Sequence, residues 1–257
     1  MRDLSMKYAV SVLLLALSLA LPANVTHAAR CCCSKADQKQ SEPTERKESE
    51  PALLKQRLWN PQEDRQAAEW FKKSAEQGDA GAQYVLGYIY ATGLAYRPCD
   101  MCPTEHIVSR DATRAFAWFN KAAGQGAGAA QYKLGLMYAQ GFGIERSDTR
   151  SVEWLRKAAE QGLATAQSDL GWMYRMGRGV ARDDAEAVRW FRMAADQGLA
   201  DTQYTLGDMY RNGKGVAQDD GAAVSWYRKA AEAKNALAQS NLGFMYEKGR
   251  GVKQDDA

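Results

Sequence analysis

"GVARDDAEAVRWFRMAADQGLADTQYTLGDMY", residues 179–210, returns 36 residues later as "GVAQDDGAAVSWYRKAAEAKNALAQSNLGFMY", residues 215–246. The two stretches agree mainly at apolar and glycine positions, and they differ mainly at polar positions. Copies at a fixed spacing of this size are typical of stacked supersecondary units, each of which buries its apolar face against the next. The stretch therefore predicts a repeat architecture whose changed residues lie on the outside.

Two markers, a tryptophan and a Leu-Gly pair, recur along the chain at the same spacing. Both series step by 48 and then by 36, 36 and 36 residues, so the first step contains a twelve-residue insertion near residues 95–108. The markers are Trp70, Trp118, Trp154, Trp190 and Trp226, and Leu86-Gly87, Leu134-Gly135, Leu170-Gly171, Leu206-Gly207 and Leu242-Gly243. We predict an all-α fold, an α-solenoid of about five 36-residue helix-turn-helix repeats over residues 52–257.

The fourth copy shows why each unit is expected to hold two helices. Asp184 can cap the first helix, because its carboxylate accepts hydrogen bonds from free backbone N–H groups. One face of this helix then carries Ala187, Val188, Phe191, Ala194 and Ala195, with Trp190 at its edge. Gly198 is suited to end the helix. A second helix, which stops at the turn 213–215, carries the stripe Thr202, Leu206, Met209 and Tyr210.

The glycine of the Leu-Gly pair lies inside the second helix, where it costs about 1 kcal/mol relative to alanine. Since all five copies have it, we expect two helix backbones to approach closely there. The predicted repeat core comprises Trp118, Trp154, Trp190, Trp226, Leu134, Leu170, Leu206, Leu242, Gly135, Gly171, Gly207 and Gly243.

The stretch "KAAEQGLATAQSDLGWMYRMGRGV", residues 157–180, resembles a Sel1-like repeat. It carries the A-A-x-Q-G, A-x-A-Q-x-x-L-G-x-M-Y and G-x-G-V elements of that family. The fifth copy departs from the pattern, with Ala233-Lys234 in place of Gln-Gly. The resemblance implies a right-handed solenoid that scaffolds protein–protein contacts, often in bacterial envelope or host-interaction pathways. Some members of the family are rich in cysteine, with a disulfide pair in each repeat and reported β-lactam binding. Outside the insertion, the repeats of this chain carry no cysteine pair, so the properties of that subgroup are not expected here.

Composition and motifs give no sign of catalysis. The chain is 46% hydrophobic and 25% charged with a net charge of +3, which is ordinary for a globular protein and gives no reason to expect a nucleic-acid partner. No glycine-rich phosphate loop or nucleophile elbow is present. Capping explains the aspartate pairs better than metal binding does, so no metal or cofactor is expected; the pairs are Asp183-Asp184, Asp219-Asp220 and Asp255-Asp256.

The N-terminus is expected to be a separate module. Arg2 and Lys7 precede a short apolar stretch, residues 8–21, and small residues follow, so residues 1–28 are interpreted as a secretory signal peptide. An uncleaved membrane anchor is the alternative. Residues 29–51 are rich in charged residues and cysteine, and are expected to form a disordered tether. The protein is therefore predicted to be exported, to the periplasm or outside the cell.

The cysteines leave several interpretations open. Cys31–Cys33 follow the predicted cleavage site, but Arg30 stands where a lipoprotein signal needs a small residue, which makes a lipid anchor the minor alternative. Cys99 and Cys102 lie in the insertion, where an oxidising compartment favours a local disulfide. A zinc site with His106 would need further ligands, and a redox motif would need a preceding strand, which the sequence pattern does not indicate.

Two surfaces are candidates for binding. A basic stripe on the first helices could dock an acidic partner, although acidic residues one turn on, Glu76, Glu160, Asp196 and Glu232, are expected to pair with much of it. The stripe comprises Lys72, Arg156, Arg192, Arg228, Lys121, Lys157 and Lys229.

The other surface is the end of the last repeat. Asp148, Asp184 and Asp220 each open a helix in the pattern, and Asp256 falls at the chain end, so Leu242, Met245 and Tyr246 are expected to be partly exposed. This end could mediate self-association.

The leading hypothesis is therefore a non-catalytic protein-interaction scaffold with an unknown protein partner. The alternative is an envelope redox accessory that uses the Cys99–Cys102 loop.

Overall fold

The computed structural model describes residues 61–96 and 105–252, of which the side chains of 61–68, 94–96 and 105–108 are not described. These ranges belong to one compact unit. The predicted signal peptide, the tether, Cys31–Cys33, Cys99, Cys102 and Asp256 lie outside the described residues. In the part of the chain that is described, no helix is both long and apolar enough to cross a membrane.

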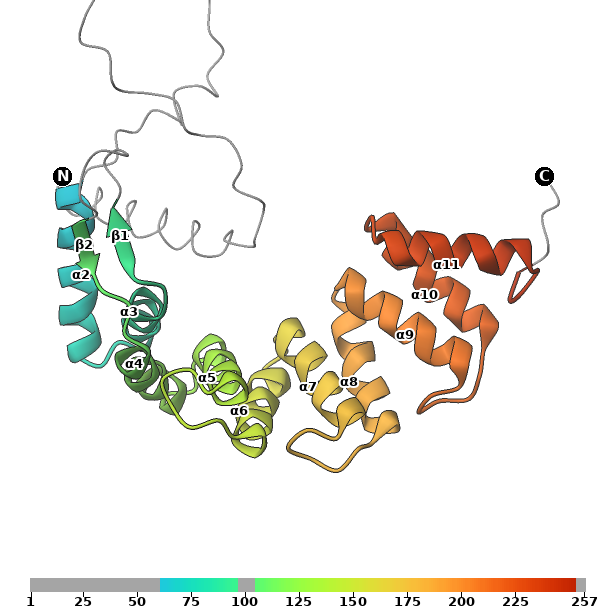
Figure 1. Cartoon of the computed structure of the whole chain (residues 1–257), viewed down its shortest axis with the longest axis horizontal. Coiled ribbons are helices and arrows are strands. Elements are labelled where there is room, and N and C mark those ends of the chain that lie inside the picture. The colour runs from blue at the N-terminus through green and yellow to red at the C-terminus, as the bar shows by residue number, and fades with distance from the viewer. Residues whose placement is uncertain (1–60, 97–104, 253–257) are drawn as a thin grey trace, which may run out of the picture. The chain divides into compact units, whose positions relative to one another are not determined.

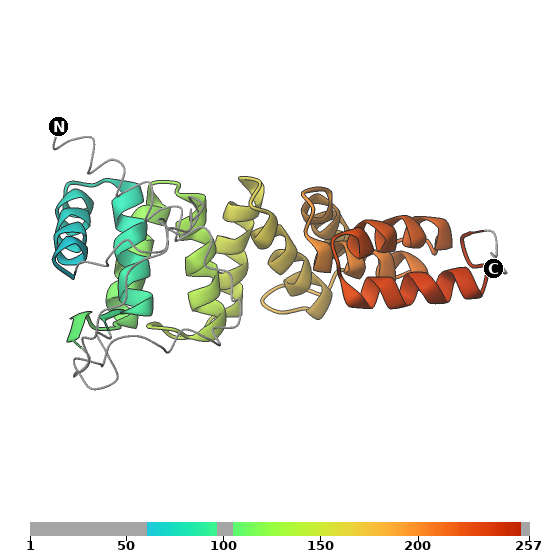
Figure 2. The same cartoon turned by 90° about the horizontal axis from the view of Figure 1, so that it is seen from above.

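Ten helices in the described ranges form five pairs, each helix packing on the one before it (Figures 1 and 2). The first helices are α2 (Pro61–Glu76), α4 (Ala112–Gly124), α6 (Asp148–Glu160), α8 (Asp184–Asp196) and α10 (Asp220–Glu232). The second helices are α3 (Ala80–Thr92), α5 (Gly128–Gln140), α7 (Ala164–Met176), α9 (Ala200–Asn212) and α11 (Ala236–Glu247). The predicted helical solenoid of 36-residue units is confirmed.

The insertion between the first two pairs contains strands that the sequence pattern did not indicate. β1 (Leu94–Tyr96) and β2 (Glu105–Val108) pair antiparallel, with Ala95 opposite His106. The expectation that the chain has no strand was therefore wrong for this segment. Runs of three and four residues are too short to show an alternating pattern, so only the pairing across the insertion defines them.

The residue after each tryptophan, rather than the tryptophan itself, fills the core. At most 4% of its surface is exposed in any repeat: these residues are Phe71, Phe119, Leu155, Phe191 and Tyr227. The predicted core tryptophans lie at the edge, partly exposed, because neighbouring positions on a helix point about 100° apart. From the same predicted set, Leu134, Leu170 and Leu206 are fully buried, whereas Leu242 is only partly buried.

The mid-helix glycine receives a side chain from the next repeat. A Cβ atom on Gly207 would lie 2.8 Å from the Tyr227 ring, and the equivalents meet Phe119, Leu155 and Phe191 at 2.7–2.8 Å. The expected close approach is thus mainly between a backbone and a side chain, which corrects the picture of two touching backbones. At Gly243, which is exposed, nothing lies within 4 Å.

Pairs of glutamines, each with a buried acceptor, join neighbouring repeats. In three places the Nε2 of one glutamine donates to the Oε1 of another at 2.8 Å: Gln125 to Gln83, Gln161 to Gln131 and Gln197 to Gln167. The fourth junction has Ala233 at the donor position, and the buried Oε1 of Gln203 has no hydrogen-bond partner among the described residues. The next residue, Lys234, adopts a φ of 65°, where the equivalent Gly198 has 90°.

Candidate functional site

The arginines of the predicted stripe contact tyrosines of the second helices. The guanidinium of Arg156 donates to the Tyr174 hydroxyl at 2.6 Å, and that of Arg228 donates to the Tyr246 hydroxyl at 2.8 Å. Arg192 makes the same contact with Tyr210. Each pair connects the two helices of one repeat.

The lysines of the stripe lie over tryptophan rings on their own helices. The Nζ atoms are 4.0–4.2 Å from the ring centroids in the pairs Lys121–Trp118, Lys157–Trp154 and Lys229–Trp226. Lys72 is exposed on α2. The expected ion pairs with Glu76, Glu160, Asp196 and Glu232 do not form within the described ranges. Except at Lys72, tyrosine hydroxyls or ring faces contact the cations of the stripe instead. Six of the seven cations of the stripe therefore already contact a tyrosine or a tryptophan of this chain.

Two adjacent residues at the start of each of the helices α6, α8 and α10 have different roles. The helix caps are Ser147, Asp183 and Asp219, one residue before the predicted caps Asp148, Asp184 and Asp220. The latter three begin their helices and accept hydrogen bonds from arginines of the adjoining loops, at 2.8–2.9 Å from Arg178, Arg182 and Arg250 respectively.

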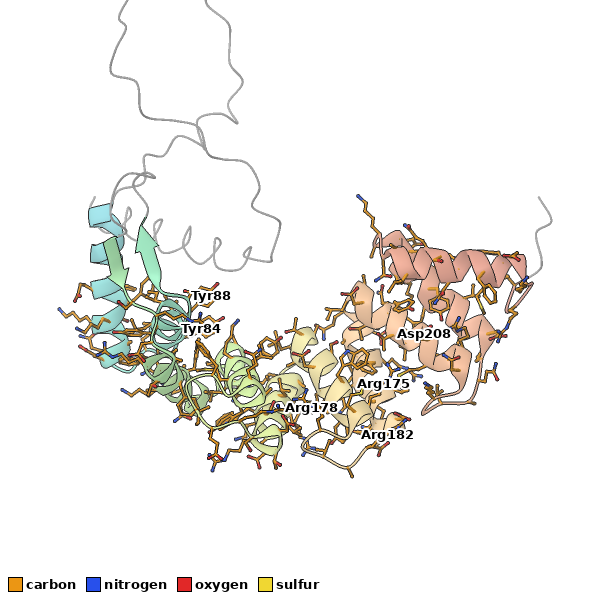
Figure 3. The ribbon with its side chains drawn as sticks, in the orientation of Figure 1. Tyr84, Tyr88, Arg175, Arg178, Arg182 and Asp208 are labelled. Carbon is orange, nitrogen blue, oxygen red and sulfur yellow. The ribbon has the colours of Figure 1, made fainter. Side chains whose placement is uncertain are left out.

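The bonds from Arg178 and Arg146 lower the pKa of Asp148. Figure 3 labels Arg178 and Arg182 in the loop after α7. Among the residues with described positions, no three histidine, cysteine, aspartate or glutamate side chains gather as a metal site would require.

The second helices of neighbouring repeats form a continuous surface, here called the second-helix face. The Tyr132 hydroxyl on α5 donates to Asp169 on α7 at 3.0 Å. Ser168 on α7 and Thr202 on α9 share a hydrogen bond of 2.9 Å. Asn241 on α11 donates to the Tyr204 hydroxyl on α9 at 3.4 Å. These contacts fix the spacing of side chains across repeats.

Exposed and partly exposed aromatic side chains line the second-helix face, with an arginine beside one of them. Trp172 is 37% exposed and Phe244 is 42% exposed. The Arg175 guanidinium lies 4.8 Å from the centroid of a Trp172 ring. Partly exposed tyrosines extend the surface to α3, α5 and α9: Tyr84, Tyr88, Tyr132 and Tyr204. Figure 3 labels Tyr84 and Tyr88 on α3, Arg175 on α7 and Asp208 on α9.

The charged groups on this face are few and partly buried. Burial raises the pKa of Asp169, against the opposing effect of the Tyr132 hydrogen bond. Burial, followed by the charge of Asp169, raises the pKa of Tyr132. Asp208 accepts a hydrogen bond from the Tyr227 hydroxyl at 2.5 Å and pairs with Arg211 at 3.3 Å. Such a surface is suited to binding rather than to acid–base chemistry, because its carboxylates are engaged by neighbouring side chains.

The sequence analysis did not identify this face, although a signal was present. Its aromatic residues stand at two positions that vary between copies, directly after the repeated glutamine and directly after the Leu-Gly pair. The first position holds Tyr84, Tyr132 and Tyr204, and the second holds Tyr88, Trp172 and Phe244. Varied positions that are rich in tyrosine and tryptophan are a pattern expected of a binding surface.

Comparison with known families and structures agrees with this architecture. The profile of the Sel1 repeat matches seven segments: 61–79, 80–101, 105–126, 128–163, 164–199, 200–235 and 236–257. These segments contain the same ten helices as the five pairs, because the longer matches begin at a second helix and end after the next first helix. A search of curated proteins finds no match.

Two similar crystal structures come from bacteria. A protective antigen present in uropathogenic Escherichia coli strains, displaying an SLR fold, is 43% identical over 74% of this chain, with a TM-score of 0.67. A Sel1 repeat protein from Oxalobacter formigenes is 36% identical over 74% of this chain, with a TM-score of 0.61. The aligned part spans 38% of the first protein and 52% of the second.

Proposed function

Because the chain belongs to the Sel1 repeat family, whose members are generally protein-interaction scaffolds, we propose that it is a non-catalytic scaffold that binds protein partners through its second-helix face. The observation that carries this proposal is the aromatic surface around Trp172 and Phe244. Tryptophan, tyrosine and arginine supply most of the binding energy in protein interfaces, since they combine large apolar area with polar ends. All three residue types are present on this one face.

The basic stripe on the first helices is the weaker candidate. Its arginines already donate to tyrosines, and its lysines other than Lys72 already lie over tryptophan rings. A partner would have to share or replace these contacts. Exposed ion pairs also contribute little, about 0–1 kcal/mol each. Desolvated aromatic side chains contribute more to affinity, which favours the second-helix face.

Export to the periplasm or outside the cell is part of the proposal, as is the alternative of a lipid anchor near Cys31. Its support is the apolar stretch within residues 1–28, together with the similarity to an Escherichia coli protein described as a protective antigen. The redox alternative predicts that replacing both Cys99 and Cys102 abolishes activity, whereas a scaffold keeps its partner after the same change.

A crosslinking pull-down with matched variants tests the proposal. The full chain captures its partners from the native host, and the double variant Trp172→Ala/Phe244→Ala should lose about tenfold or more of that capture. Met193→Ala is the matched control, since Met193 on α8 is 47% exposed but lies on a first helix. Circular dichroism verifies that both variants fold. Unchanged capture by the double variant, or loss of capture by Arg156→Ala/Arg228→Ala instead, would refute this choice of face.

A further inference from the structure

A hollow on the second-helix face lies between α3 and α5. Its volume is about 160 Å³, and the residues that matter here are Tyr88, Lys133, Leu136 and Phe142. Three of these are apolar or aromatic, and Lys133 is the one charged residue in its lining. The hollow therefore combines a mostly apolar lining with a single positive charge.

Lys133 lacks the partners that its counterparts have. The equivalent residues in two later repeats, Asp169 and Asn241, form hydrogen bonds with Tyr132 and Tyr204 of the preceding repeat. In the described part of the chain, no carboxylate pairs with the Lys133 ammonium and no hydrogen bond satisfies it. Its nearest aromatic contact is the Tyr88 ring, with the Nζ 5.7 Å from the centroid. Half-burial without an anion lowers the pKa of Lys133.

We propose that this hollow binds an acidic side chain of a peptide segment in the protein partner, with its carboxylate on the Lys133 ammonium and the flanking apolar atoms against Tyr88 and Leu136. The inference rests on the proposed function and adds that the partner presents an acidic residue beside apolar ones. A carboxylate would supply the missing counter-charge, and in a partly desolvated site a charge-assisted hydrogen bond is about twice as strong as a neutral one. Phosphate recognition usually relies on clusters of arginine, and this lining has none.

Selection from random peptides tests the chemistry without knowledge of the partner. The immobilised full chain is panned with a phage library of short peptides. Enriched sequences should contain Asp or Glu at a fixed distance from an apolar residue. Each enriched peptide and its amide twin, with Asp→Asn or Glu→Gln, are then titrated by fluorescence anisotropy.

The decisive readout is the coupling between the peptide acid and Lys133. On the unmodified chain, the amide twin should bind about tenfold more weakly than the acid. On Lys133→Met, the acid and its twin should bind equally. Lys121→Met, which removes an exposed lysine from a first helix, should keep the full difference. Lys133→Met should not lower the melting temperature, because it removes a half-buried charge that has no counter-ion.

Three results would overturn the inference: no enriched peptides, enriched peptides without an acidic residue, or the same acid–amide difference on Lys133→Met. Different results would refute the proposed function itself. If enriched peptides lack an acid but lose binding to Trp172→Ala/Phe244→Ala, the second-helix face remains the binding surface and only the role of Lys133 is refuted. If the pull-down shows no dependence on that double variant, the proposed face itself is wrong.

Discussion

Replacing Ala233 with glutamine should strengthen the junction between the fourth and fifth repeats. At the two preceding junctions, Gln161 and Gln197 donate to a buried glutamine Oε1 at 2.8 Å and to a glycine carbonyl at 3.0 Å. At the last junction the donor is missing, and the Oε1 of Gln203 is buried without a partner among the described residues. Glutamine at position 233 would have both acceptors available, Gln203 and the Gly198 carbonyl.

The expected gain follows from two opposing terms. Satisfying a buried acceptor is worth about 1–3 kcal/mol, and ordering a glutamine side chain costs about 1.5–2 kcal/mol. With a second hydrogen bond to the Gly198 carbonyl, the net gain in the free energy of unfolding should be about 1 kcal/mol. In a repeat protein this gain concentrates on the two repeats that meet at the junction, and the fifth of them consists of α10 and α11.

Native-state hydrogen exchange measures this local effect. Amides of α10 and α11 should exchange about fivefold more slowly in Ala233→Gln, and the melting temperature should rise by about 2–4 °C. Ala233→Met is the control, since it adds a side chain of similar length without an amide. If Ala233→Met protects α10 and α11 as well as Ala233→Gln does, the hydrogen bond is not the cause and the reasoning is wrong.

The other predictions concern packing and pH. Gly207→Ala should lower the free energy of unfolding by about 1–3 kcal/mol, because the new methyl group meets the Tyr227 ring at 2.8 Å. Gly243→Ala is its matched control: with nothing within 4 Å, it should be neutral or stabilise by up to about 1 kcal/mol in thermal melts. Equal destabilisation by both would contradict the packing argument. Asp169→Asn should raise the melting temperature at pH 7. The pKa of Asp169 is raised in the folded state, so ionisation of this carboxyl group destabilises the folded protein as the pH rises through that pKa. The difference in melting temperature between Asp169→Asn and the unmodified chain should vanish near pH 3, where the carboxyl group is protonated in both the folded and unfolded states. A difference independent of pH would show that the charge of Asp169 is not its cause.

The sequence by itself determined the repeat length, the helix pairs and most of the buried positions. Leu134, Leu170 and Leu206 could be placed in the core because helical periodicity is local, and each copy repeats the same evidence. The Gln-Gly departure at Ala233-Lys234 was also visible in the sequence. The sequence did not show that this departure leaves the Gln203 side chain without a hydrogen-bond donor among the described residues, because Gln203 lies thirty residues earlier on another helix.

Tertiary structure decided which side chains meet. Arg156 could pair with Glu160 on its own helix or with Tyr174 on the next helix. The packing of the two helices decides between them, and the spacing of residues within one helix does not. For the same reason the second-helix face emerged only when α3, α5, α7, α9 and α11 were placed side by side. Contacts within a turn are fixed by local spacing, whereas contacts between repeats depend on the packing angle of whole helices.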